Sequence, residues 1–333
     1  MTKKLSDQFN NKKILITGGT GSFGSTFLNN LIKHSRPKKI LIFSRDEMKQ
    51  WDLKEKLKKY QNVDFIIGDV RDGEKIFNSF RGIDFVVHAA ATKIVPTAER
   101  NPEECIKTNV LGAMNVINSS IQNKVTKVVA LSTDKASSPI NLYGATKLCS
   151  DKLFTSQINH QTKTLFSVVR YGNVLGSRGS LIPFFLSLKN KKELPITHPN
   201  MTRFFLTLED AVNFVNFAFR IMKGGEIFVK KLNAIKIVEL AKLINPRAKH
   251  KIVGIREGEK IHEQMIGVDD SLFTVEFKDH YEILPNLKIK ALKLKMKAKK
   301  VKPNFIYSSN TTGKLSKSYL QKKINQIKIR LKI

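Results

Sequence analysis

A glycine-rich segment near the N-terminus is the sequence feature that constrains the fold most. Residues 17–24 read Thr-Gly-Gly-Thr-Gly-Ser-Phe-Gly and directly follow the apolar run Lys13–Thr17. The pattern G-x-G-x-x-G starts at Gly19, and its three-residue-spaced variant starts at Gly18. Glycines are needed where a tight turn brings the backbone close to a pyrophosphate, and the helix that follows directs its N–H groups at this anion. The segment predicts a dinucleotide site at the start of a βαβ unit.

The first half of the chain alternates short β-branched runs with longer helical stretches, the pattern of a parallel, doubly wound α/β sheet. The expected strands are nearly continuous apolar runs, as in sheets covered on both faces: Lys13–Thr17, Lys39–Ser44, Val63–Gly68, Asp84–His88, Lys127–Ser132 and Leu165–Arg170. The expected helices lie between and after them: Gly24–His34, Asp46–Lys59, Asp72–Phe80, Pro102–Gln122 and Tyr143–Asn159.

Beyond Arg170 this rhythm loosens, because glycines and prolines follow one another quickly, as in loop-rich substrate regions. A helix at Leu208–Met222 and a strand at Glu226–Val229 are expected to return to the sheet. We therefore expect a nucleotide-binding domain over residues 10–175, with returning elements at about 205–230. A smaller substrate-binding and C-terminal part is expected to occupy residues 176–204 and 231–333.

Length and composition indicate a globular protein without a membrane span. The chain has 333 residues, of which 41% are hydrophobic and 26% are charged. The N-terminus has no apolar core of signal-peptide length, and no unbroken apolar run is long enough to cross a bilayer. The two cysteines, Cys105 and Cys149, make no metal-binding spacing and suggest a reducing compartment. We therefore expect a cytoplasmic protein without a metal site.

The formal net charge of +31 is concentrated toward the C-terminus. No Asp or Glu follows Glu282, and eight lysines alternate with apolar residues between Lys288 and Lys302. One interpretation is an anionic partner such as nucleic acid or a membrane surface. The other, which we favour, is a lysine-rich solvated surface on an enzyme with polyanionic substrates. The interleaved aromatics of single-strand binders and any nucleic-acid motif are missing, so no specific nucleic acid is expected, while weak membrane-surface contact stays open.

The end of the second expected strand indicates which dinucleotide binds. Most NAD-binding loops place an acidic residue on the ribose 2′-hydroxyl about 20 residues after the glycines, but this chain has Ser44 and Arg45 there. A hydroxyl and a guanidinium suit a 2′-phosphate, with help from Lys49, so the sequence favours NADP. Asp46 follows directly and leaves NAD open. Asp69, at the end of the third strand, is expected to accept a hydrogen bond from the adenine amine or to cap a turn.

Two proton-handling pairs lie close together in residues 132–147, which read Ser-Thr-Asp-Lys-Ala-Ser-Ser-Pro-Ile-Asn-Leu-Tyr-Gly-Ala-Thr-Lys. Tyr143 and Lys147 lie one helical turn apart, so the ammonium is expected to lower the tyrosine pKa from its usual value of about 10. Asp134 and Lys135 precede them. Tyr143 and Lys147 suit the oxidation of an alcohol. Asp134 and Lys135 suit the loss of water next to the oxidised carbon. The run follows the fifth strand, at the sheet edge where ligands bind.

These motifs resemble those of the extended short-chain dehydrogenase/reductases of the Rossmann fold. Within them, the chain is similar to the UDP-N-acetylglucosamine 4,6-dehydratases that invert C5. Retaining dehydratases of the dTDP-glucose type carry Asp-Glu where this chain has Asp134-Lys135, and long membrane-bound relatives tend to have Met in place of Tyr143. The resemblance covers almost the whole chain and includes residues 17–24, 43–47, 68–72, 104–109, 132–147, 170–174, 176–180, 201–204, 258–260 and 307–309.

The resemblance implies a mechanism. Tyr143, assisted by Lys147 and Thr133, removes the proton of the sugar 4-hydroxyl during hydride transfer from C4 to NADP⁺. A neutral Lys135, whose pKa must be depressed by burial and by neighbouring cations, abstracts the C5 proton. A protonated Asp134 donates to the departing 6-hydroxyl. Alternatively, Asp134 and Lys135 merely pair with each other on a loop.

The resemblance also implies binding residues and partners. For the cofactor these are Gly18, Thr20, Gly21, Ser22, Phe23, Gly24, Ser44, Arg45, Asp69, Val70, Ala89, Ala90, Lys93, Asn109, Tyr143 and Lys147. For the substrate, UDP-N-acetylglucosamine, they are Lys93, Asn173, Arg178, Arg203, Arg256 and Glu259. Glu99 and Glu263 are expected to have surface or helix-capping roles instead. The implied reaction is the first step of pseudaminic acid biosynthesis, and the implied assembly is a homo-oligomer, with a hexamer suspected.

The chain departs from the family pattern at two places, and two other functions compete with the dehydratase. Where relatives read Leu-Lys-His, this chain has Thr92-Lys93-Ile94, in a loop that is expected to border the active site. Glu257 stands where a proline is usual. A 4-epimerase or a retaining dehydratase on a related UDP-sugar would not explain Lys135. A non-catalytic NADP-binding or basic surface-binding protein would not explain the intact catalytic set of Thr133, Tyr143 and Lys147.

Overall fold

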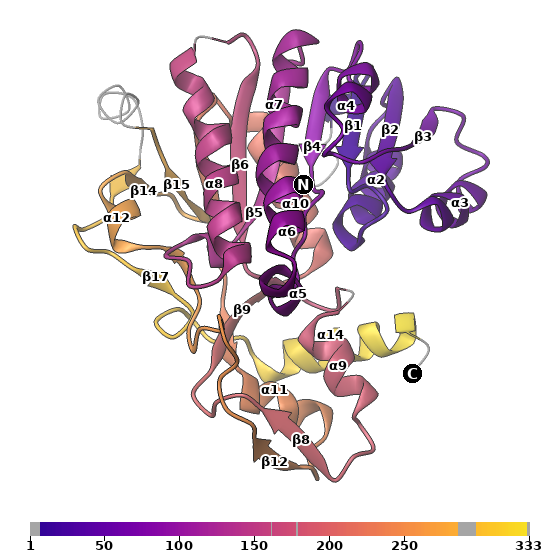
Figure 1. Ribbon diagram of the computed structural model, residues 1–333. Helices are drawn as coiled ribbons and strands as arrows, with labels where there is room; N and C mark the ends of the chain where they lie inside the picture. The colour runs from indigo at the N-terminus through magenta and orange to yellow at the C-terminus, as the bar shows by residue number, and fades with distance from the viewer. Residues whose placement is uncertain (1–6, 161, 178, 286–297, 332–333) are drawn as a thin grey trace.

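The computed structural model describes residues 7–160, 162–177, 179–285 and 298–331, and its largest feature is a ten-stranded sheet (Figure 1). Seven neighbouring strands run parallel, in the order β10-β6-β5-β4-β1-β2-β3. Their bounds are β1 Lys13–Thr17, β2 Lys39–Ser44, β3 Val63–Ile67, β4 Phe85–His88, β5 Lys127–Thr133, β6 Leu165–Tyr171 and β10 Ile227–Lys230. Each lies within one residue of an expected strand, which confirms the doubly wound parallel sheet.

Three C-terminal strands extend this sheet beyond β10. The strand β15 (His280–Ile283) pairs antiparallel with β10, and β14 (Thr274–Glu276) and β16 (Lys299–Lys300) follow in antiparallel order. No strand was expected in this part of the sequence. These strands are short and cover the outer edge of β10, so they leave a much weaker apolar pattern than the buried parallel strands do.

Helices cover both faces of the sheet (Figure 1). On one face α4, α7 and α8 pack together, while α2 and α10 pair on the other. The expected helix Pro102–Gln122 is interrupted: α6 ends at Ile106 and a π-helical turn, η2 (Lys107–Leu111), precedes α7. The helix bounds are α2 Ser22–His34, α3 Glu47–Lys56, α4 Gly73–Ser79, α5 Val95–Arg100, α6 Pro102–Ile106, α7 Gly112–Gln122, α8 Leu142–Ser156 and α10 Leu208–Ile221, with 3₁₀ turns η1 Asp7–Phe9, η3 Asp134–Ala136 and η4 Gln157–His160.

A smaller unit with its own hydrophobic core lies at the lower end of the view in Figure 1. Its core includes Leu194, Phe205, Leu240 and Ile324, each almost completely buried. Its strands pair as β8 with β12 and as β11-β9-β7. The bounds are β7 Asn173–Val174, α9 Leu181–Ser187, β8 Glu193–Ile196, β9 Thr202–Leu206, β11 Ala234–Lys236, α11 Ile237–Ile244, β12 Lys249–Ile252 and α14 Lys317–Leu331.

The remaining elements connect the two units. The strand β13 (Gln264–Ile266) pairs with β17 (Tyr307–Ser308), and α12 (Val268–Ser271) leads on to β14. Met265 and Tyr307 belong to the core of the large sheet, although both lie in the expected C-terminal part. The two cores therefore interleave along the chain, and the domain boundaries stay a prediction. Among the described residues, no helix is both long and apolar enough to cross a membrane. Most of the basic run from Lys288 to Lys302 lies outside them.

Candidate active site

A cavity of about 1160 Å³ lies where the carboxyl ends of the parallel strands face the smaller unit. Ligands bind at this edge in doubly wound sheets. All five expected catalytic residues line it: Thr133, Asp134, Lys135, Tyr143 and Lys147. The glycine loop lines it as well, so one cavity holds both the expected cofactor region and the expected chemistry.

The glycine loop is shaped for a close backbone approach. Gly18 has φ +66°, and a Cβ there would lie 2.8 Å from the backbone nitrogen of Ala90. A Cβ on Gly24 would lie 2.5 Å from the Cα of Gly19, so the start of α2 packs directly on the loop. The N-cap of α2 is Gly21, which has no side chain to cap the helix. The loop therefore fits the pyrophosphate of a dinucleotide.

The end of β2 presents a hydroxyl and a cation rather than a free carboxylate. The Ser44 hydroxyl is buried and accepts a hydrogen bond from Gln50 Nε2 at 3.0 Å. The Arg45 side chain is 58% exposed and lies 3.4 Å from Asp69. Asp46 is the N-cap of α3, where its carboxylate accepts from the Lys49 N–H at 2.9 Å and pairs with the Lys49 ammonium.

Asp69 forms a tight turn with Arg71. Its carboxylate accepts from the Arg71 backbone N–H at 3.0 Å and from Nε at 2.9 Å. Partial burial raises the pKa of Asp69, but these bonds and the charges of Arg71 and Arg45 outweigh it and hold the pKa below its usual value. The carboxylate therefore stays ionised at the cavity edge.

The catalytic run turns sharply between β5 and α8. The Thr133 hydroxyl accepts from the Lys135 N–H at 3.3 Å and caps η3, which carries Asp134 and Lys135. Asn141 caps α8 through a 2.7 Å bond from the Gly144 N–H. A Cβ on Gly144 would lie 2.3 Å from the Lys135 carbonyl oxygen, so only glycine lets α8 begin this close to η3. This approach brings both proton-handling pairs to one wall of the cavity.

The pKa of Tyr143 differs from the sequence expectation. Burial raises the pKa of this phenol to about 12, and the Lys135 ammonium and a hydrogen bond with Thr133 lower it only partly. Burial lowers the pKa of Lys147, while Asp151 one turn further along α8 raises it. The expectation that Lys147 brings the tyrosine pKa below 10 is therefore wrong.

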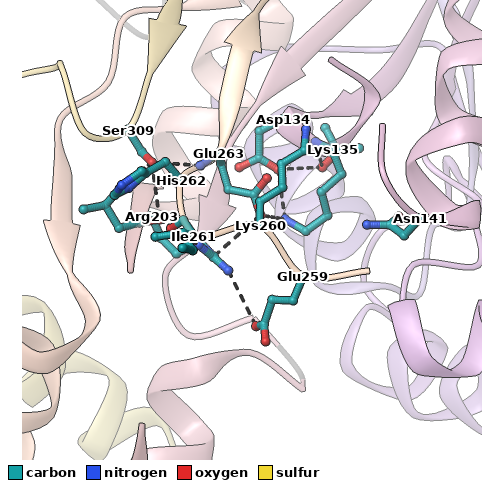
Figure 2. Close-up of polar contacts among 12 residues, drawn as sticks. Asp134, Lys135, Asn141, Arg203, Glu259, Lys260, Ile261, His262, Glu263 and Ser309 are labelled. Carbon is teal, nitrogen blue, oxygen red and sulfur yellow. Dashed lines mark hydrogen bonds and ion pairs between the residues drawn. The ribbon is translucent and has the colours of Figure 1, made fainter. Parts of the chain in front are cut away.

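A buried ion network surrounds Lys135, as Figure 2 shows. Its ammonium lies 3.0 Å from Asp134 Oδ1 and 2.9 Å from Glu263 Oε1. Burial lowers the pKa of Lys135, but these two carboxylates outweigh burial and raise it above the usual value. The expectation of a depressed Lys135 pKa is thus wrong. Burial also raises the pKa of Asp134, in line with the expected protonated donor.

Glu263 is the functional candidate that the sequence analysis missed. It is only 1% exposed, so the expected surface or helix-capping role is wrong. Glu99 does cap a helix, because it accepts from the Leu142 N–H at the start of α8 at 2.7 Å. Glu263 lies in residues 256–266, which we call the C-terminal strap. The Gly258-Glu259-Lys260 motif marked this segment, but nothing local distinguished Glu263 from a surface glutamate.

Three of the expected substrate residues come together at the strap. Glu259 accepts two hydrogen bonds from Arg256, at 2.8 and 3.1 Å, and lies 3.5 Å from Arg203 (Figure 2). Asn173 and Lys93 also line the cavity. The Asn173 side-chain oxygen is buried and has no hydrogen-bond partner among the described residues, as expected for an atom that meets a ligand.

Among the described residues, one expected binding residue, Asn109, does not line the cavity. Arg178 lies outside the described residues. Asn109, in η2, is buried behind the wall, where its amide bonds the backbone N–H and carbonyl of Thr92 at 2.8 and 2.9 Å. The remaining expected cofactor residues all line the cavity: Gly18, Thr20, Gly21, Ser22, Phe23, Gly24, Ser44, Arg45, Asp69, Val70, Ala89, Ala90, Lys93, Tyr143 and Lys147.

A family model described as "Polysaccharide biosynthesis protein" matches residues 14–285. A protein of Campylobacter jejuni (strain 81-176), named UDP-N-acetylglucosamine 4,6-dehydratase (inverting), is 52% identical over 91% of this chain and 93% of its own length. A Rickettsia canadensis protein named UDP-glucose 4-epimerase is 44% identical over 83% of each chain.

Solved structures share the fold. The X-ray structure of Pen from Bacillus thuringiensis is 36% identical, with a TM-score of 0.87 over 96% of this chain and 99% of its own. DesIV, a dTDP-glucose 4,6-dehydratase from Streptomyces venezuelae with NAD bound, is 21% identical, with a TM-score of 0.68 over 75% of this chain and 86% of its own. DesIV supports the Rossmann-like fold only.

Proposed function

Because the chain belongs to the polysaccharide biosynthesis protein family, we propose that it is a UDP-N-acetylglucosamine 4,6-dehydratase that inverts C5. The observation that carries this proposal is the position of Lys135. It reaches the same cavity as Tyr143 and contacts the buried Asp134 at 3.0 Å. An alcohol-oxidising tyrosine, an acid and a separate base are the three groups that dehydration at C5 and C6 requires.

The first step oxidises C4. A bound nicotinamide dinucleotide supplies the hydride acceptor for C4 and later the hydride donor for C6. Tyr143 takes the proton of the 4-hydroxyl, and the hydrogen bond with Thr133 and the Lys135 charge favour its phenolate. Lys147 lies one turn further along α8 and is almost completely buried. Ionisation of a phenol whose pKa is about 12 makes this step depend on the charges that line the cavity.

The second step eliminates water. The 4-ketone acidifies the C5–H bond, and Lys135 takes this proton while the C5–C6 double bond forms. The C6–O bond breaks, and Asp134 protonates the departing hydroxyl to give water. With hydride supplied to C6 by the bound dinucleotide, C5 would take a proton on the opposite face, which removes the double bond and inverts this centre.

The raised pKa of Lys135 is compatible with its role as a base. An ionised Asp134 beside a charged Lys135 contains the same number of protons as a protonated Asp134 beside a neutral Lys135. The substrate therefore needs only to shift one proton along the 3.0 Å contact, and no proton has to leave the cavity. The pair titrates as a unit, and its singly protonated state is the active one.

We propose NADP as the dinucleotide. Ser44 and Arg45 line the cavity where a ribose 2′-phosphate is expected, and the Arg45 side chain is 58% exposed, whereas Asp46 is engaged as the N-cap of α3. The charge of Lys49 also lies at this end of the cavity. A bound 2′-phosphate would compete with Asp69 for Arg45.

A 4-epimerase is the second candidate, because relatives such as the Rickettsia canadensis protein carry this name. Epimerisation needs the tyrosine but no base at C5. A lysine held between two carboxylates in the cavity would then have no chemical task. The product separates the two candidates, since epimerisation retains the 6-hydroxyl and exchanges no hydrogen at C5.

The deciding experiment incubates the purified protein with UDP-N-acetylglucosamine in D₂O and follows the product by NMR and mass spectrometry. Loss of water, one deuterium at C5 and the L-arabino configuration are expected, and released nucleotide is expected to be NADP. The same label with retained configuration would contradict inversion. A 4-epimer without deuterium would establish the epimerase.

The remaining proposals concern the setting of the reaction. We place the protein in the cytoplasm as a homo-oligomer, with a hexamer as the expected assembly, and its product in pseudaminic acid biosynthesis. Light scattering measures the assembly, and conversion of the product by a transaminase specific for this 4-keto sugar tests the pathway. Nucleotide-bound but inactive protein that binds nucleic acid in a salt-dependent way would favour the non-catalytic alternative.

A further inference from the structure

We propose that Glu263 is a positioning residue that holds the Asp134–Lys135 pair in place and sets the pH range in which the pair is active. This inference rests on the proposed function, because it assigns the pair its acid and base roles. Glu263 itself is given no contact with the reacting atoms. It acts through Lys135.

The contact geometry supports this role. Glu263 Oε1 lies 2.9 Å from the Lys135 ammonium and 3.6 Å from Arg203 Nε, so one oxygen faces two cations (Figure 2). Its second oxygen, Oε2, is buried without a hydrogen-bond partner among the described residues, as is Oδ2 of Asp134. An almost fully buried carboxylate is costly unless cations stabilise its charge. Glu263 therefore remains ionised beside Lys135, and these cations lower its pKa despite burial.

Both backbone polar groups of Glu263, its N–H and its carbonyl, are hydrogen-bonded. Its N–H donates to the Ser309 hydroxyl at 2.9 Å, and its carbonyl accepts from the Ser309 N–H at 2.9 Å. The Ser308 hydroxyl adds a bond to the same carbonyl at 3.2 Å. Ser309 is in turn hydrogen-bonded to Thr202 at 2.7 Å, at the start of the strand that carries Arg203 (Figure 2). The carboxylate is thus held at one place and can determine where the Lys135 side chain lies.

Charged groups face Glu263 from several elements. Lys135 and Asp134 come from η3, Arg203 comes from β9, and Lys260 comes from the strap itself. Lys260 donates to the Ser137 carbonyl at 2.7 Å, which ties the strap to the end of η3. Three cations therefore face two carboxylates here. Without the Glu263 charge, the pair would lie in a strongly positive surrounding.

The direction of the expected pH effect follows from this charge. The active, singly protonated pair forms when one proton is lost from the doubly protonated pair, and it disappears when the second proton is lost. A negative charge next to the pair makes both losses harder and places both limbs of the rate profile at higher pH. Removing that charge must therefore move both limbs to lower pH. A general loss of structure would lower the maximum without moving the limbs.

The test measures kcat against pH for wild type, Glu263→Gln and Glu263→Asp. In Glu263→Gln we expect both limbs to shift to lower pH by about one unit or more, with a maximal kcat roughly 100-fold lower because Lys135 is less well placed. Glu263→Asp retains the charge, so its limbs should stay near those of wild type while its maximum falls. Glu259→Gln is the matched control, since Glu259 contacts Arg203 and Arg256 but not Lys135. It should raise KM and leave the limbs in place.

A second measurement does not depend on turnover. Acetic anhydride acetylates neutral amines, and mass spectrometry of the peptide that contains Lys135 reports its acetylation rate at each pH. We expect acetylation to begin at lower pH in Glu263→Gln than in wild type and Glu263→Asp. If this shift appears while wild type leaves UDP-N-acetylglucosamine unchanged, the proposed function fails and the electrostatic role of Glu263 stands. If wild type is an active dehydratase and neither the limbs nor the acetylation profile moves, the inference is overturned.

Discussion

The glycine loop and the C-terminal strap line the same cavity but obtain their shapes in different ways. The join between the loop and α2 is shaped by close neighbours in the sequence, since the tightest contact of Gly24 is with Gly19, although Gly18 packs on the backbone of Ala90. The strap is shaped by distant ones. Asn141 Nδ2 donates to the Gly258 carbonyl at 2.7 Å, and Lys260 donates to Ser137, in each case across more than 100 residues. The packing of α2 on the glycine loop is therefore a local feature of the chain, whereas the charges around the catalytic pair exist only in the folded protein.

This difference separates two kinds of substitution. A side chain added in the glycine loop would clash with backbone atoms that cannot move aside. Such a substitution therefore affects both folding and cofactor binding. A change in the polar residues of the strap, Arg256–Glu263, alters a charge or a hydrogen bond near η3, while the core of the large sheet, which includes Met265, keeps its side chains. The following predictions test whether the two regions behave in these ways.

The largest effect is expected in the catalytic run, residues 132–147, which lines the same cavity as the glycine loop and the strap. Lys135→Ala removes the base at C5 and Tyr143→Phe removes the acceptor of the 4-hydroxyl proton. Each should lower kcat about 1000-fold or more, because general acid and base groups contribute up to about 10⁴-fold each. Both variants should still fold and bind NADP, although Lys135→Ala should lower the melting temperature because Asp134 and Glu263 lose the buried cation between them. Turnover is followed by NMR with UDP-N-acetylglucosamine.

Lys152→Ala is the matched control, because Lys152 is an exposed lysine on α8. It should retain full activity. Full activity in Lys135→Ala would contradict the mechanism. Loss of NADP binding in this variant would show that Lys135 also supports cofactor binding.

Much of the fold could be predicted from the sequence because the signals are local. Buried parallel strands are continuous apolar runs, so the expected strands were within one residue of the observed ones. The spacing of Tyr143 and Lys147 likewise specifies one helix face. By contrast, the π-helical turn η2 interrupts Pro102–Gln122 without any proline or glycine at Lys107–Leu111 to mark it. Nothing in the local pattern predicts this extra backbone residue per turn.

The electrostatics of the site could not be predicted in the same way. Lys135 was expected to have a depressed pKa, but two carboxylates raise it, and one of them lies 128 positions further along the chain. The sign of a pKa shift depends on which charges lie within a few ångströms. The spacing of Asp134 and Lys135 contains no information about Glu263. Local motifs thus indicated which residues line the cavity, but not their protonation states.

A medium effect is expected in the glycine loop. A Cβ on Gly24 would lie 2.5 Å from the Cα of Gly19, and the larger side chain of Gly24→Val would have to displace this backbone. We expect a loss of about 1–3 kcal/mol in the free energy of unfolding and NADP binding weaker by about tenfold or more. Denaturant unfolding and nucleotide titration measure the two effects.

Gly73→Ala at the start of α4 is the control, since its Cβ would first meet the side-chain oxygen of Asn115 at 3.3 Å and no backbone of the glycine loop. It should change NADP affinity very little. If Gly24→Val bound NADP as wild type does, the glycine loop would not be the rigid cradle that its contacts indicate.

The smallest effect is expected at the support of the strap. Ser309→Ala removes the acceptor of the buried Glu263 N–H, and leaving such a donor unpaired costs about 1–2 kcal/mol. Ser308→Ala is the matched control, because the Glu263 carbonyl keeps its 2.9 Å bond from the Ser309 N–H. Both limbs of the rate profile should stay in place in either variant, since the Glu263 charge remains, while kcat falls a few-fold only in Ser309→Ala. Equal losses of kcat and stability in the two variants would show that the strap is held by its general packing, and that the single hydrogen bond to Ser309 does not position Glu263.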